Sequence, residues 1–297
     1  MAEELIENQL EKPDRAAGEP APEHWSKLEG DGGARLSFAE YGEGIGNASA
    51  VLRNNLAAVG LDAPVPTCPG WSTRDLLVHV GVAQRWAIVV LSGGSRSPDV
   101  GSLTAGLADY PDPLDWLDAG AVGVLNALVK ADAGGDYFFF LKNAPADKRE
   151  AWARRQCHEA TIHAVDAMAT RIGGLPTAAQ MWFKAPLAID GIDELLRGFV
   201  PRRSSPLRSE SEMSLAIVST DLADSSGADA GTGWTVRFGP DGATTEQGVA
   251  SDVDATMSGS AIALYLALWN RGSEFEVDGD SDVVQAFSNL MKVQWDG

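Results

Sequence analysis

The amino-acid sequence predicts an up-and-down four-helix bundle followed by a smaller α+β domain. The 297 residues are enough for two ordinary domains of about 150 residues each. Between residues 36 and 174, four segments place apolar residues at helical spacing and are joined by modest connections. After Gly174, short strand patterns alternate with helical ones. We therefore expect a disordered acidic arm over residues 1–35, the bundle over 36–174 and the α+β domain over 175–297.

The arm lacks the helical periodicity that predicts the first two helices. Residues 1–35 are polar, acidic and without periodicity, which is typical of disorder. A helical pattern then runs to Gly60, a plausible C-terminal stop. The second helix has the clearest start, because Ser72 is a good N-cap and Asp75, three residues later, completes an approximate capping box.

The third and fourth helices complete the expected bundle. The stretch "GGSRSPDVGS", residues 93–102, reads as a loop. The third helix follows over "DPLDWLDAGAVGVLNALVKA", with Pro113 in its first turn. The fourth runs from about Asp147 to Ile172 and is ended by two glycines.

The C-terminal part mixes helical and extended segments. We expect a helix within residues 178–200, a linker over 201–211, strands within 212–221, 233–248 and 274–280, and helices within 260–272 and 281–295. This order predicts an α+β domain.

Composition excludes several kinds of partner and location. The net charge is −19 and the pI is near 4.5, which disfavours nucleic acid and anionic membrane surfaces as partners. No run of 18 apolar residues occurs, and the acidic N-terminus lacks the apolar stretch of a signal peptide, so we expect a cytoplasmic protein. The two cysteines, Cys68 and Cys157, make neither a disulfide framework nor a CxxC pair, and we expect both to be buried and inert.

The stretch "RRQCHEATIHAVDA" carries a candidate metal site on the fourth helix. Glu159 and His163 are four residues apart and share a face, whereas His158 lies about 100° around the helix. His79 falls on the core-facing side of the second helix. Two histidines and one carboxylate from facing helices form a set typical of a catalytic zinc ion. Asp166, on the same stripe, could orient a ligand imidazole.

The same residues also have plainer interpretations. Glu159 and His163 could form a surface pair, and His79 could be a hydrogen-bonded core residue. Asp166 could be a solvated or pairing acid. Spacing alone does not choose between these alternatives.

Taken together, three segments resemble the mycothiol-dependent maleylpyruvate isomerase family. "PVPTCPGWSTRDLLVHVGVAQRW" and "ARRQCHEATIHAVDA" resemble its two metal-bearing segments, and "MSGSAIALYLALWNRG" with "EFEVDGD" resembles its C-terminal domain. The resemblance covers roughly residues 40–297. It implies a DinB-like bundle, metal ligands at His79, Glu159 and His163, and an α+β domain that helps to close the active site.

The resemblance also implies the cofactor and a class of reaction. The thiol would be mycothiol, which is found in actinobacteria, and Arg271 would bind an anionic group of substrate or cofactor. Arg155 is a second candidate for that role on its position near the site alone, because the resemblance does not extend to it, and it is otherwise a surface charge. We expect Zn²⁺, or another divalent ion, to hold the thiol as a thiolate, with Asp166 as the candidate catalytic residue outside the ligand set.

Several reactions fit such a site. From the sequence we favour transfer of mycothiol to a small electrophile, or exchange on an S-conjugate. The alternatives are mycothiol-dependent cis-trans isomerisation of a maleylpyruvate-like acid, metal-activated hydrolysis, or a binding protein without catalysis.

Overall fold

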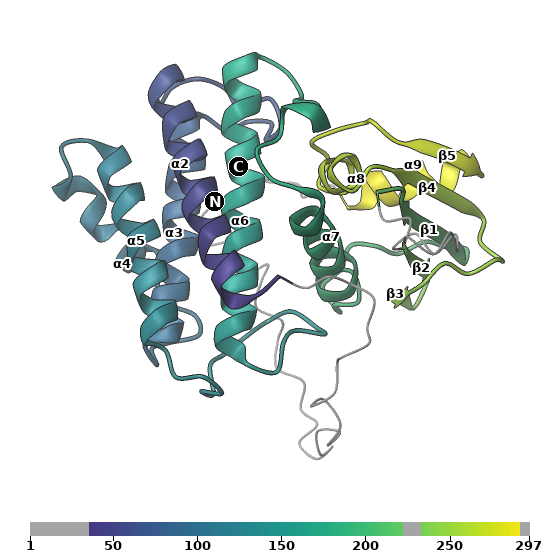
Figure 1. Cartoon of the computed structure of the whole chain (residues 1–297), viewed down its shortest axis with the longest axis horizontal. Coiled ribbons are helices and arrows are strands. Elements are labelled where there is room, and N and C mark those ends of the chain that lie inside the picture. The colour runs from purple at the N-terminus through teal and green to yellow at the C-terminus, as the bar shows by residue number, and fades with distance from the viewer. Residues whose placement is uncertain (1–35, 222–232, 292–297) are drawn as a thin grey trace.

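The computed structural model describes residues 36–221 and 233–291, and its N-terminal part is a four-helix bundle (Figure 1). The four long helices are α2 (Phe38–Val59), α3 (Thr73–Leu91), α5 (Pro113–Lys130) and α6 (Lys148–Ile172). A short helix α4 (Val100–Thr104) and a 3-10 turn η1 (Ala105–Asp109) connect α3 to α5.

The order of the helices around the bundle differs from their order in the chain. Helix α2 packs against α6 and α5, and α3 packs against α5 and α6. Helices α2 and α3 are therefore at opposite corners, although they are consecutive in the sequence. Their connection crosses the end of the bundle, and it carries Cys68 and Trp71 into the core beside α6.

Local capping explains where the bundle helices begin. The Ser72 hydroxyl accepts a hydrogen bond from the Asp75 backbone N–H, and the Asp75 carboxylate accepts one from the Ser72 N–H. A matching capping box joins Ser37 and Glu40 at the start of α2. These contacts satisfy N–H groups that the first turn of a helix leaves without partners.

The C-terminal part contains a mixed five-stranded sheet. Its elements are η2 (Ala178–Gln180), α7 (Ala185–Asp193), the π-helix η3 (Glu194–Phe199), β1 (Met213–Ser219), β2 (Gly233–Gly239), β3 (Gly242–Gln247), β4 (Ala255–Gly259), α8 (Ala261–Leu268), β5 (Glu276–Gly279) and α9 (Ser281–Leu290). The strand order is β3-β2-β1-β4-β5, in which only β1 and β4 run parallel.

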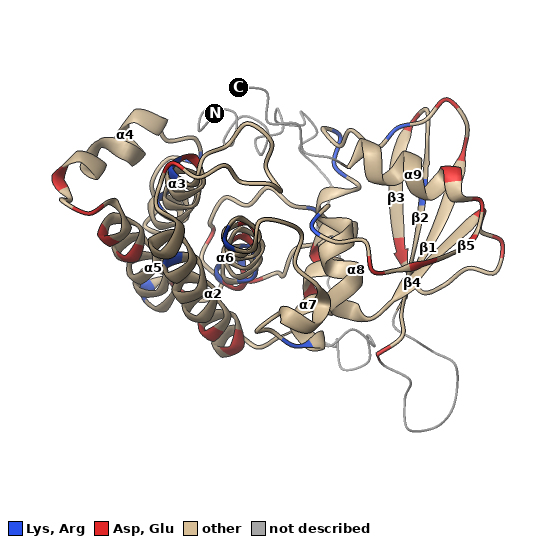
Figure 2. Cartoon of the chain, turned by 90° about the horizontal axis from the view of Figure 1, so that it is seen from above, with Lys and Arg blue, Asp and Glu red and all other residues tan. Residues whose placement is uncertain are grey.

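The two parts share a hydrophobic core. Ile162 and Val165 of α6 belong to the same buried cluster as residues of α7, α8 and the sheet. In Figure 2, α7 and α8 lie between α6 and the strands. Charged positions are also visible on α6, in the middle of the molecule. The side of α6 that faces away from the bundle is therefore covered by the C-terminal part.

The predicted fold class is confirmed, but three local expectations are wrong. Residues 93–102 do not form only a loop, because Asp99 caps helix α4. The helix expected within 178–200 is divided into η2, α7 and the π-helix η3. Strand β4 was not expected, because only Ala255 and Met257 supply its buried apolar pattern.

Two expectations concern residues beyond the described ranges. The predicted arm over residues 1–35 lies outside them, as does the end of the closing helix after residue 291. The domain boundary near residue 174 stays a prediction. Within residues 36–221 and 233–291, no helix has both the length and the apolarity that a membrane span requires.

Candidate metal centre

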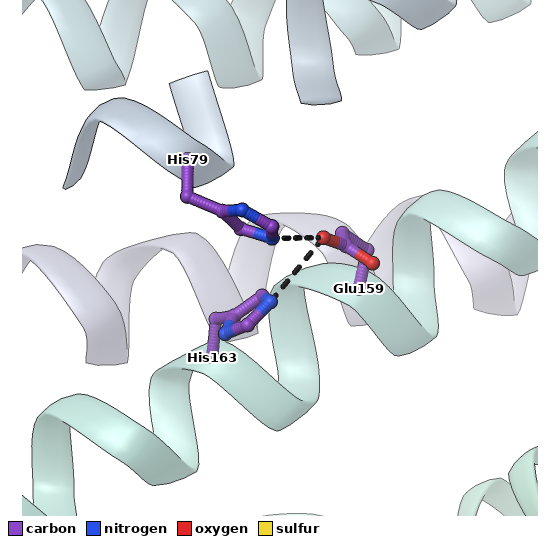
Figure 3. Close-up of side chains that lie close together, drawn as sticks. All are labelled: His79, Glu159 and His163. Atoms are coloured by element: carbon purple, nitrogen blue, oxygen red, sulfur yellow. Dashed lines mark hydrogen bonds and ion pairs between the residues drawn. The ribbon is translucent and has the colours of Figure 1, made fainter. Parts of the chain in front are cut away.

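The structure brings His79, Glu159 and His163 together between α3 and α6. Glu159 Oε1 lies 3.1 Å from His79 Nε2 and 3.3 Å from His163 Nε2 (Figure 3). One ligand atom from each residue lies within 4.8 Å of the others. All three residues are buried, so Glu159 and His163 are not the surface pair that their spacing also allowed.

The spacing of these atoms fits a small divalent ion. Zinc binds nitrogen and oxygen at about 2.1 Å, so two of its tetrahedral ligands are about 3.4 Å apart. The two imidazole-to-carboxylate distances, 3.1 and 3.3 Å, are close to that separation. Two neutral imidazoles and one carboxylate are also a donor set that zinc and similar divalent ions accept.

Asp166 orients one of the two imidazoles. Its Oδ2 lies 2.8 Å from His163 Nδ1, so a proton on Nδ1 leaves Nε2 directed toward Glu159. Burial opposes ionisation of Asp166, but the charges of Arg271 and His163 hold its pKa well below the ordinary range. Asp166 is therefore a buried, paired carboxylate and is not a solvated acid.

Arg271 binds Asp166 from the C-terminal part of the chain. Its Nε donates to Asp166 Oδ1 at 2.8 Å and its Nη2 donates to Oδ2 at 3.0 Å. Nη1 donates to the Trp269 carbonyl, and Nη2 also contacts Cys68 Sγ at 3.3 Å. The Arg271 guanidinium has five N–H donors, and it thus makes four hydrogen bonds with described residues. The predicted contact of Arg271 with an anionic group stays a prediction.

Arg155 contacts a residue of the predicted ligand set. Its Nη2 donates to Glu159 Oε2 at 2.9 Å, and its Nη1 pairs with Glu194. Only 2% of Arg155 is exposed, so it is not the surface charge that its sequence also allowed. Its predicted role in binding substrate or cofactor is not tested by these contacts.

The protonation of the centre follows from this network. Burial lowers the pKa of His79. Burial also opposes the charged form of His163, but hydrogen bonds with Asp166 and Glu159 outweigh it and raise the pKa of His163 to about 9. Burial alone would raise the pKa of Glu159, yet its contacts with the two histidines hold it well below the usual range. In the protein without metal, His163 is therefore the protonated member.

Both halves of the chain match models of one protein family. Residues 43–168 match the mycothiol maleylpyruvate isomerase N-terminal domain, and residues 186–286 match the C-terminal domain of the same family. Together the two matches cover most of the chain and both of its structural parts. The chain belongs to the mycothiol maleylpyruvate isomerase family.

Solved structures support the family fold. The chain is similar to the crystal structure of the mycothiol-dependent maleylpyruvate isomerase, with a TM-score of 0.52 and 13% identity over 82% of this chain and 93% of the other. A histidine-to-alanine mutant of that enzyme matches with a TM-score of 0.50 and the same identity and coverage. At 13% identity, these likenesses describe the fold alone. No protein of curated function matches the sequence.

The structure adds residues to the site that sequence reasoning did not place there. Trp71 packs its ring 4.9 Å from that of His79, and Cys68 contacts Asp166. Glu194 reaches the centre through Arg155. The position of Trp71 directly before the N-cap Ser72 is a signal that the sequence contains. Glu194 lies within a segment that the sequence predicts as one helix, and nothing in that pattern distinguishes it.

His158 is excluded from the three-residue centre, as its position on the helix predicted. Its Nε2 lies 2.7 Å from Asp190 Oδ1 in α7. Arg154 and Tyr41 bind the same carboxylate at 2.8 Å each. In this family member, α6 thus has two buried polar sides: one holds the candidate metal ligands and the other joins the two parts of the chain.

Proposed function

We propose that this chain is a metal-dependent enzyme that uses mycothiol to catalyse the cis-trans isomerisation of a maleylpyruvate-like acid. The observation that carries the proposal is the convergence of His79, Glu159 and His163 in a chain that belongs to this family. The sequence alone favours transfer of mycothiol or exchange on an S-conjugate. The family and its solved structures are named for an isomerase, so the alternative reaction is now the better supported one.

The ligand set would prepare a thiol for attack. A bound divalent ion, which we expect to be zinc, supplies a positive centre that lowers the pKa of a coordinated thiol. Asp166 keeps the His163 ring in one orientation, and Trp71 packs beside the imidazoles. These contacts support a rigid site in which the ligand atoms are already in place.

The cysteines of the chain do not compete with an external thiol. Burial raises the pKa of Cys157 to about 12, and it also raises the pKa of Cys68, whose Sγ faces the Asp166 carboxylate. Both side chains are therefore protonated near neutral pH, and a thiol is a much weaker nucleophile than a thiolate. This supports a nucleophile supplied by mycothiol.

Isomerisation requires the thiol to be returned unchanged. The sulfur forms a bond to one alkene carbon of the acid, and the π electrons move into the conjugated carbonyl as an enolate. The former double bond is then single and rotates. When the enolate electrons return, the alkene is restored in the trans form and the sulfur–carbon bond breaks. Transfer would instead end with the sulfur still bound to carbon.

The first experiment measures metal and thiol binding in wild type and in Glu159→Ala. Elemental analysis gives the metal content, and calorimetry gives mycothiol binding. We expect one metal per chain and metal-dependent thiol binding in wild type, with both lost in the variant. Wild-type protein without metal, or equal thiol binding in both proteins, would contradict the proposal.

The second experiment identifies the reaction. Maleylpyruvate is mixed with metal-loaded enzyme and a small amount of mycothiol, and substrate and thiol are followed together. Many product molecules per mycothiol, with the thiol recovered, are expected for isomerisation. Consumption of one thiol per product would favour the transferase, and turnover without mycothiol would favour a hydrolase.

A further inference from the structure

Arg155 is a buried cation held between two carboxylates. Glu159 Oε2 accepts from its Nη2 at 2.9 Å, and Glu194 Oε2 accepts from its Nη1. The rings of Phe199 and Trp269 cover the guanidinium, with centroids 5.2 and 5.9 Å from Cζ. Arg155 and Glu194 are each only 2% exposed. The pair therefore connects the candidate metal ligand Glu159 to the C-terminal part of the chain.

This arrangement is poorly explained by stability. Desolvation of a buried ion pair often cancels its attraction, and apolar replacements of similar size can be neutral or stabilising. Arg155 Nε and Glu194 Oε1 also find no hydrogen-bond partner among the residues that the structure describes. A cluster with such costs calls for a role other than holding the fold together.

The π-helix η3 supplies two of the contacts of Arg155, Glu194 and Phe199, from one short segment. The Val200 N–H donates to the Leu195 carbonyl at 3.1 Å, the i→i+5 bond of a π-turn. Residues five apart lie close to the same face of such a turn, whereas in an α-helix they diverge by about 140°. Glu194 and Phe199 are five apart, so the wider turn lets one supply the charge and the other the ring.

The contact with Arg155 determines which oxygen of Glu159 faces the two imidazoles. Because Arg155 holds Oε2, the other oxygen, Oε1, faces His79 Nε2 and His163 Nε2. Without Arg155, Oε2 would lose this partner, and only the contacts of Oε1 with the two imidazoles would orient the carboxylate. Glu194 thus acts through Arg155 on the orientation of Glu159 Oε1, an atom with which Glu194 itself makes no contact.

We propose that Glu194 is a positioning residue: it fixes Arg155, and Arg155 fixes Glu159 so that one carboxylate oxygen faces the imidazoles. This inference rests on the proposed function, because the orientation of Glu159 matters in this way only if Glu159 binds a metal. It assigns to the C-terminal part a role in shaping the metal centre, in addition to its expected role in closing the active site.

The test compares Glu194→Gln with wild type. Zinc affinity is measured by competition with a chromophoric chelator, and the Co²⁺-substituted protein gives an absorption spectrum that reports the ligand geometry. Residues that orient metal ligands typically change affinity by about 10- to 100-fold when mutated. We expect a loss of zinc affinity in that range together with a changed Co²⁺ spectrum.

Asp193→Asn is the matched control. Asp193 is the preceding residue, and its carboxylate binds Arg154 and Arg197 and has no contact with Arg155 among the described residues. It should keep the wild-type zinc affinity and spectrum even if it lowers stability. An unchanged centre in Glu194→Gln, or an equal loss in Asp193→Asn, would overturn the inference.

A double variant separates positioning from charge balance. Arg155→Met with Glu194→Met removes both members of the pair, so neither charge is left buried alone. If Glu194 positions the ligand, the double variant still binds zinc weakly. If the pair only balances charge and Glu159 needs no contact with Arg155, the double variant recovers wild-type affinity and the inference is wrong. Absence of metal from wild-type protein would instead refute the proposed function itself.

Discussion

Asp166 is the residue through which two parts of the protein meet at the candidate centre. It accepts from Arg271 on one side and fixes His163 on the other. Asp166→Asn keeps the size of the side chain and removes its charge. Because the His163 ring then loses its anionic partner, we expect zinc affinity to fall by about 10- to 100-fold. Chelator competition measures the change.

Asp118→Asn is a suitable control for that substitution. Asp118 is a partly exposed carboxylate that pairs with Arg53 on the outside of the bundle. Its replacement should leave zinc affinity unaltered. If Asp166→Asn binds zinc as tightly as this control, Asp166 does not orient a ligand.

His163 makes metal binding depend on pH. Its pKa is raised to about 9 in the protein without metal, and a metal ligand must be the neutral imidazole. Binding below that pH therefore displaces one proton, so zinc affinity should rise about tenfold per pH unit as the pH increases toward 9 and then level off. Titrations between pH 6 and pH 9.5 test this slope. A flat profile would mean that His163 is already neutral.

At the scale of elements, helices α3 and α5 are brought together by a glycine. A Cβ on Gly81 would lie 1.9 Å from the Trp116 ring, whereas a Cβ on Gly46 in α2 would meet nothing within 4 Å. Gly81→Ala should therefore destabilise the protein by about 1–3 kcal/mol through overpacking. Gly46→Ala should stabilise it by about 0.5–1 kcal/mol, because alanine is the better helix former. Urea unfolding measures both, and similar shifts would contradict the close packing.

Elements that begin at a local contact could be predicted from the sequence, whereas elements with partners distant in sequence could not. The start of α3 was predictable, because Ser72 and Asp75 form a local contact that needs no other part of the chain. The approach of His79 to α6 was also predictable, because His79 lies on the apolar, core-facing side of its own helix. Glu194 of the π-turn contacts Arg155, and the strand at Met257 pairs with β1. Both partners are far away in sequence, and no local pattern marked either element.

The candidate centre likewise has features that the sequence could predict and features that it could not. Glu159 and His163 could be paired from their spacing on one helix, whereas their burial depends on elements more than 20 residues away. The partners of Arg155 and Arg271 depend on how the C-terminal part lies against α6. Sequence therefore indicated which side chains could bind an ion, and the fold supplies the contacts that orient them.

At the scale of the whole molecule, Asp190 joins the two parts on the side of α6 that does not face the candidate centre. Tyr41, Arg154 and His158 all bind its carboxylate, which is fully enclosed. Burial opposes the charge, but Arg154 and His158 hold the pKa of Asp190 below its ordinary range. Its contribution to stability is therefore present above the unfolded pKa, near 4, and is lost as the pH falls further.

Asp190→Asn tests whether this joint stabilises the fold without serving the centre. Removing one partner of a buried pair costs about 3–5 kcal/mol, and Asp193, which also faces Arg154, keeps the expected loss near the lower limit. Urea unfolding at pH 7 should show that loss, and the gap from wild type should narrow in acid. Zinc affinity of the folded variant should stay at the wild-type value, because Asp190 contacts none of the three candidate ligands. A loss of affinity without a loss of stability would place Asp190 in the metal centre.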